Sequence, residues 1–111
     1  MRQRKDRRAR RYPVRVELKE INGKPGAGNF LLDLSAMGAK LETGTAFVPG
    51  TPVEISFIFP EGEEEVRLAG RVVWSRPVIG QLSRYTLGIK LFQSLWELEF
   101  LARRWQNLQT K

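Results

Sequence analysis

Apolar and polar residues alternate along most of the chain, with the two-residue period that is typical of half-buried β-strands. The pattern begins at Tyr12–Glu20, where Val14, Val16 and Leu18 fall on one face and charged residues on the other. Five later segments repeat it and are predicted as strands: residues 29–34, 39–42, 53–59, 66–74 and 85–91. The pattern therefore predicts a protein built mainly of strands.

Segments that contain glycine, proline, asparagine or serine separate the predicted strands. We expect turns or loops at residues 22–26, 35–38, 44–52, 60–63 and 77–83. Phe30, Leu32 and Leu34 share one phase and are expected on one buried face. Gly70 interrupts the longest strand, and an interior glycine in a strand often marks a bulge or a barrel corner.

The period changes near the end of the chain, where apolar residues recur every third or fourth position. One helical face would hold Leu95, Leu98, Leu101 or Ala102, Trp105 and Leu108. Ser94 and Glu97 have the spacing of a capping box, so the helix should start near Leu95 and end near residue 109. Trp96 and Trp105 are expected to pack the helix against the rest of the protein.

These elements predict an all-β fold with a terminal helix. Six or seven antiparallel strands would close into a small β-barrel, because closing the sheet removes its exposed edges. The helix, at about residues 95–109, would cover an open end or side of the barrel. Residues 12–111 would form this unit, and residues 1–11 a flexible arm.

The composition fits one small globular domain and removes several kinds of chemistry. The chain has 111 residues, 41% of them hydrophobic, and contains neither cysteine nor histidine. Disulfides, thiolate metal sites and histidine bases are therefore excluded. No paired-carboxylate or Ser–Lys arrangement stands out, so we expect no enzyme, no metal and no cofactor. No transmembrane segment or cleavable signal is visible, which favours a cytoplasmic protein.

The net charge of +7 is concentrated at the start of the chain. The first fifteen residues hold seven arginines and one lysine against a single acid, Asp6, whereas the rest has eleven basic and eleven acidic residues. Arginine suits phosphate and the Hoogsteen edge of guanine, and its flat face stacks on rings. The arm therefore indicates an anionic, nucleotide-like partner. A solvated tail and an arm that binds RNA or DNA remain alternatives.

Residues 33–38, Asp-Leu-Ser-Ala-Met-Gly, lie between two predicted strands. Taken alone, this segment is a turn stabilised by Asp33 and Ser35, in which Gly38 supplies a positive φ. Its position after an arginine arm gives it a second interpretation.

Together, the two segments resemble the signature of the PilZ domain family, an RxxxR motif followed by (D/N)xSxxG. Arg7 and Arg11 match the first motif, directly before Tyr-Pro-Val, and residues 33–38 match the second in full. Segments 70–74 and 87–92 also resemble later strands of the family, so the resemblance covers about residues 4–92. The alternative registers of the first motif are Arg4 with Arg8 and Arg11 with Arg15.

The resemblance implies a bacterial receptor for cyclic di-GMP. Arg7 and Arg11 would donate to guanine O6 and N7 and to phosphate oxygens, and would stack on a base. Arg8 would make an accessory contact, and Arg10 is a further candidate.

The second motif would complete the site. Asp33 would accept from guanine N1–H or N2–H₂, Ser35 would add a hydroxyl contact, and Gly38 would let the backbone approach the ligand. Trp74 is either a further ligand contact or a core aromatic residue on a barrel strand.

The mechanism implied is ordering rather than catalysis. Bound cyclic di-GMP would neutralise the arginines, fold residues 1–11 across the barrel and create a surface for a downstream protein partner. Two alternatives remain: a small barrel that binds nucleic acid through the arm, and a PilZ-like protein–protein adaptor that has lost its ligand.

Overall fold

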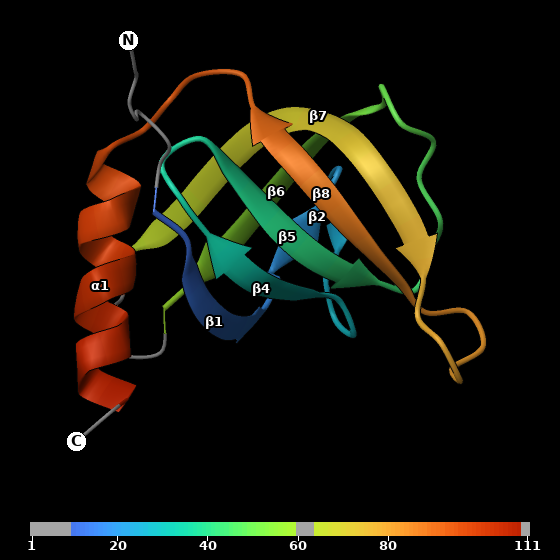
Figure 1. The fold of residues 1–111 in the computed structure, drawn as a ribbon, viewed down its shortest axis with the longest axis horizontal. Helices are drawn as coiled ribbons and strands as arrows, with labels where there is room; N and C mark the ends of the chain where they lie inside the picture. Colours follow the sequence, from blue (N-terminus) through green and yellow to red (C-terminus); the bar gives the residue numbers. More distant parts are fainter. Residues whose placement is uncertain (1–9, 60–63, 110–111) are drawn as a thin grey trace, which may run out of the picture.

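The computed structural model describes residues 10–59 and 64–109. Within them, one antiparallel sheet of eight strands curls into a half-barrel and is followed by a helix (Figure 1). The elements are β1 (Tyr12–Glu17), β2 (Glu20–Ile21), β3 (Lys24–Pro25), β4 (Phe30–Leu34), β5 (Gly38–Thr43), β6 (Pro52–Ile58), β7 (Glu65–Pro77), β8 (Tyr85–Leu91) and α1 (Glu97–Gln109). The order across the sheet is β1-β4-β5-β8-β7-β6-β2-β3.

The predicted fold class is confirmed: the protein is mainly β, with a single C-terminal helix. The strand count exceeds the predicted six or seven because β2 and β3, of two residues each, form a short hairpin that the alternation did not resolve. The part of the predicted arm before Arg10 and the predicted turn at residues 60–63 lie outside the described residues.

The first predicted strand, residues 12–20, is divided because the chain changes its hydrogen-bonding partner within it. The Leu18 amide donates to the Asn29 carbonyl, just before β4, at 2.8 Å, whereas the Lys19 amide donates to the Ser56 carbonyl in β6, also at 2.8 Å. β1 therefore pairs with β4, and β2 pairs with β6. This change of partner links two distant strands of the sheet and holds its curl.

Gly26 allows the chain to make this corner. Its amide donates to the Lys19 carbonyl at 2.9 Å, and a Cβ at this position would lie 2.6 Å from the Leu18 carbonyl oxygen. Lys19 also donates to the Glu65 carboxylate of β7 at 2.9 Å, and this hydrogen bond lowers the pKa of Glu65. Two interactions thus stabilise the corner: the backbone hydrogen bond between Gly26 and Lys19, and the ion pair between Lys19 and Glu65.

The predicted phase of β4 is correct for Leu34 but wrong for the residues before it. Leu31 and Leu34 are fully buried, whereas Phe30 and Leu32 are only partly buried. A bulge between Leu31 and Asp33, in the pairing with β5, inserts one extra residue and shifts the alternation.

The bulge of β7 lies between Val72 and Trp74 rather than at Gly70. Gly70 is required for a different reason, because a Cβ there would overlap the Lys90 carbonyl oxygen of β8.

The core fills the inside of the curled sheet, and α1 packs over it against β1 and β4 (Figure 1). As predicted, Leu98 and Ala102 of the helix are buried and Leu95 and Leu101 pack beside them. The expected packing of Trp96 is wrong, because this side chain is 56% exposed. The side chains of Trp105 and Leu108 lie outside the description.

The helix starts at Glu97, two residues later than the capping-box spacing predicts. The Leu95 amide donates to the Ala36 carbonyl at 2.7 Å, which keeps the chain outside the helix at this point. Ser94 and Glu97 form no hydrogen bond with each other, and the Leu98 amide instead donates to the Leu95 carbonyl at 3.0 Å. Across residues 10–59 and 64–109, no helix is long and apolar enough to cross a membrane.

Replacing Gly26 with alanine should destabilise the fold, because the new Cβ would meet backbone atoms that cannot move independently. We expect a loss of about 1–3 kcal/mol, the usual cost of overpacking. Gly44→Ala is the matched control, since its nearest neighbours lie at 3.6 and 3.9 Å, and it should change stability by less than about 0.5 kcal/mol. Urea unfolding measures both variants, and equal stabilities would contradict the account of the corner.

Candidate functional site

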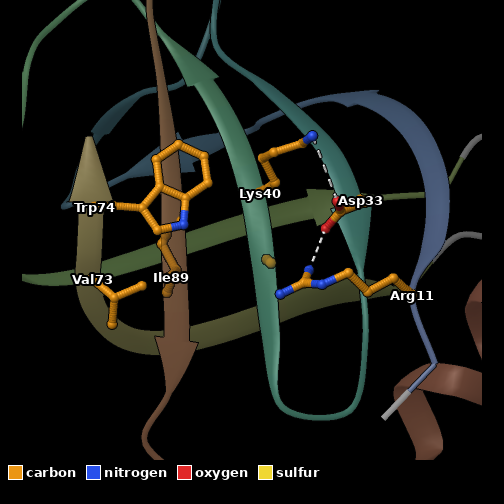
Figure 2. Close-up of a pocket in the computed structure, with 8 residues that line it drawn as sticks. Arg11, Asp33, Lys40, Val73, Trp74 and Ile89 are labelled. Atoms are coloured by element: carbon orange, nitrogen blue, oxygen red, sulfur yellow. Dashed lines mark hydrogen bonds and ion pairs between the residues drawn. The ribbon is translucent and has the colours of Figure 1, made fainter. Parts of the chain in front are cut away.

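A hollow of about 280 Å³ lies on the face of the sheet that is turned away from the core (Figure 2). It is lined by Arg11, Asp33, Ala39, Lys40, Val73, Trp74, Gly88 and Ile89. Arg11 and Asp33 stand on one side of it and Trp74 on the other, with Lys40 between them. Polar and aromatic groups from four strands or their ends thus meet at one place.

The strand register explains why these residues meet. Asp33 of β4 pairs with Lys40 of β5, Lys40 pairs with Gly88 of β8, and Gly88 pairs with Trp74 of β7. Residues that are directly opposite one another in neighbouring strands point to the same face of a sheet. The bulges in β4 and β7 place Asp33 and Trp74 in this row.

Asp33 is held between two cations. Arg11 Nη1 donates to Asp33 Oδ1 at 2.7 Å, and Lys40 Nζ lies 4.0 Å from Oδ2. The Asp33 side chain is only 15% exposed, whereas those of Arg11 and Lys40 are 57% and 44% exposed. The carboxylate is thus oriented by its partners, and the two cationic groups remain open to solvent.

Trp74 forms the opposite wall of the hollow. Its indole lies over Gly88, where any Cβ would overlap the ring, and the Arg76 guanidinium lies 4.8 Å from the ring centroid. Trp74 does not belong to the buried core cluster. The structure therefore contradicts the interpretation of Trp74 as a core aromatic residue. Its contact with a ligand stays a prediction.

Ser35 and Gly38 shape the turn rather than line the hollow. The Ser35 hydroxyl accepts from the amides of Met37 and Gly38 at 3.2 and 3.1 Å, and the residue is 2% exposed. Gly38 does not have a positive φ, so that part of the simple turn interpretation is wrong. Its Cβ would instead lie 2.5 Å from the Ile89 carbonyl oxygen and 3.8 Å from Arg11 Nη2. Both residues hold β4 and β5 in the register that places Asp33 opposite Lys40, at the hollow.

The other arginines differ in their positions. Arg7 and Arg8 lie outside the described residues, and Arg10 is exposed and does not line the hollow. Arg15 lies over the Phe30 ring at 4.2 Å, and its guanidinium is 3.7 Å from the Glu42 carboxylate. Arg11, not Arg15, therefore meets Asp33.

Lys40 is the charged residue of the hollow that the sequence analysis did not select. A signal for it was present, because a four-residue turn at 35–38 pairs residue 34 with 39 and residue 33 with 40. Counting across the turn would have placed Lys40 beside Asp33.

The cationic groups, the oriented carboxylate and the indole are arranged to bind an anion that carries a flat, hydrogen-bonding ring. They form a candidate ligand-binding site on the outside of a half-barrel. The chain belongs to the PilZ domain family, because the model of the PilZ domain matches residues 3–97. This confirms the resemblance noted in the sequence. PilZ domains are binding and adaptor domains, not enzymes, and form a family of cyclic di-GMP receptors.

No curated protein and no solved structure matches the chain. The assignment to the family therefore rests on the family model and agrees with the fold and with both motifs.

Replacing Gly88 with alanine should displace the Trp74 indole, because the ring lies where the new Cβ would be. The indole Nε1–H resonance of Trp74 should shift or broaden in a ¹⁵N spectrum. The resonance of Trp96, which is exposed between β8 and α1, should stay in place. If the Trp74 resonance is unchanged, the indole does not lie over Gly88.

Proposed function

We propose that this protein is a receptor for cyclic di-GMP whose binding face is the hollow between Arg11, Asp33 and Trp74. The observation that carries the proposal is the 2.7 Å pair of Arg11 and Asp33 at the wall of that hollow. It brings together one residue from each of the two family motifs, which are 22 positions apart in the chain.

The chemistry of the ligand matches the groups present. A guanine base offers N1–H and N2–H₂ as donors, and an ionised carboxylate accepts several hydrogen bonds at once. Asp33 can therefore accept from a guanine while it keeps one bond to Arg11. The exposed faces of Arg11 and Lys40 would then meet the phosphate oxygens, and the indole of Trp74 would support the ring.

The hollow is smaller than the ligand as a whole. Its volume of about 280 Å³ lies at the lower limit of ordinary ligand pockets, which begin near about 300 Å³. It would hold one guanine and leave the other guanine and the phosphodiesters outside. Arg7, Arg8 and Arg10 of the arm would cover that remaining part, and Ser35 and Gly38 would act through the turn.

The proposed output is ordering of the arm. Residues 1–11 carry seven positive groups against one acid and contain few apolar residues, so they repel one another until an anion binds. Binding of the dinucleotide would fold the arm over the hollow and change the surface that a downstream protein meets.

In the nucleic-acid alternative, the same arm binds the phosphate backbone, and Asp33 makes no contact that this binding needs. A carboxylate within reach of the phosphate backbone opposes binding that depends on charge alone. The oriented, partly buried Asp33 therefore favours a ligand with hydrogen-bond donors on its ring.

The Arg11→Ala and Asp33→Ala variants should each bind cyclic di-GMP about tenfold or more weakly in a calorimetric titration. Each replaces a charge-assisted contact of about 1–3 kcal/mol, and about 1.4 kcal/mol corresponds to tenfold. Arg15→Ala is the matched control, since Arg15 lies on Phe30 and Glu42 and should retain most of the affinity.

GTP and cyclic GMP should bind weakly or not at all in the same titration. Absence of cyclic di-GMP binding by the unmodified protein would overturn the proposal. Steeply salt-dependent binding of RNA that Asp33→Ala leaves intact would favour the nucleic-acid alternative.

The ordering of the arm predicts a change in amide hydrogen exchange. Saturating cyclic di-GMP should slow exchange within residues 1–11 and leave exchange in β6 unchanged, because β6 contributes no residue to the hollow. The Arg11→Ala variant at the same ligand concentration is the control. Tight binding without any gain of protection in the arm would separate ligand binding from the proposed ordering and disprove the latter.

A further inference from the structure

Three exposed aromatic side chains follow one another where the chain leaves β8 and enters α1. Phe92 is 54% exposed, Trp96 56% and Phe100 59%. Ten aromatic residues have a described side chain, and these three alone among them are more than half exposed. We call residues 92–100 the aromatic segment. Single exposed apolar residues are ordinary, but the concentration of all three in nine residues is not.

The aromatic segment is tied to the turn of the candidate site. The Leu91 amide donates to the Met37 carbonyl at 2.9 Å, and the Leu95 amide donates to the Ala36 carbonyl at 2.7 Å. Ala36 and Met37 are the middle residues of the turn between Asp33 and Gly38. The chain is therefore hydrogen-bonded to the turn after Asp33 at two points, one directly before the aromatic segment and one within it.

Positive charge flanks the aromatic segment at both ends. The Arg71 guanidinium lies 5.5 Å from the Phe92 ring centroid. Arg103 and Arg104 are exposed and follow Phe100 by three and four positions, which places them beside it on the helix. Within the segment, the structure describes one acidic side chain, that of Glu97, and it is exposed. A complementary surface would be apolar in its centre and acidic at its edges.

We propose that the aromatic segment is the docking site for an acidic, amphipathic helical segment of a second protein. Tryptophan and arginine are the residues that most often dominate the energy of protein interfaces. The arginines at the two ends would face carboxylates of the partner, which favours an acidic partner over a second copy of this basic surface. Docking itself is independent of the proposed function; its regulation by cyclic di-GMP, through the turn at 35–38, rests on that function.

The test uses a synthetic helical peptide of about sixteen residues, with leucines on one face and glutamates on both sides of that face. A second peptide carries lysine in place of each glutamate. In fluorescence anisotropy with the full chain, the acidic peptide should bind at least about tenfold more tightly than the basic one. Trp96→Ser and Phe100→Ser should each weaken its binding by about tenfold or more. Ile79→Ser is the matched control, because Ile79 is 97% exposed at the β7–β8 hairpin and should have no effect.

Equal affinity for the two peptides, or unchanged binding by the Trp96 and Phe100 variants, would overturn the proposal. Two further results would also overturn it, because each would identify a different occupant. One is that the unmodified chain self-associates and the variants do not. The other is that the unmodified chain binds phosphatidylglycerol vesicles and the variants do not. Both variants should keep the affinity of the unmodified chain for cyclic di-GMP. Failure of that titration in the unmodified chain would count against the proposed function alone, because the peptide experiment needs no dinucleotide.

Discussion

The register of four neighbouring strands governs the candidate site. A shift of one residue in a strand sends every following side chain to the opposite face of the sheet. The bulges at Leu32 and Val73 each introduce such a shift, and they bring Asp33 and Trp74 into one row with Lys40 and Gly88. Without the bulges, the carboxylate and the indole would not share this face. The candidate site is thus a consequence of strand pairing, and Gly88, which has no side chain, leaves the space that the indole fills.

Charge acts on top of this geometry. The chain beyond its first fifteen residues has no net charge. The charges that act most strongly on Asp33 are therefore those of its own neighbours, Arg11 and Lys40. Arg11 reaches it because buried Tyr12, Val14 and Val16 turn the alternate residues of β1 outward. The pair of Arg11 and Asp33 holds both groups in place before any ligand arrives. A partner that satisfies both charges can use this orientation without first having to create it.

The turn at residues 35–38 connects the face that carries the candidate site with the start of the helix. The buried Ser35 hydroxyl closes it, and its two middle carbonyls hold the chain on either side of residues 92–94. The proposed regulation of docking would act through these backbone hydrogen bonds.

The sequence by itself determined the fold class, the approximate position of every long strand, the helix, the concentration of positive charge and both motifs. Local periodicity and turn residues carry that information, because they act over a few neighbouring positions. Only the tertiary structure decided that Leu31 rather than Leu32 is buried, that the first strand divides at Leu18, that Lys40 joins Asp33, and that Trp96 faces solvent. Each of these depends on pairing or packing between residues far apart in the chain, and no local pattern records which partner a strand will meet.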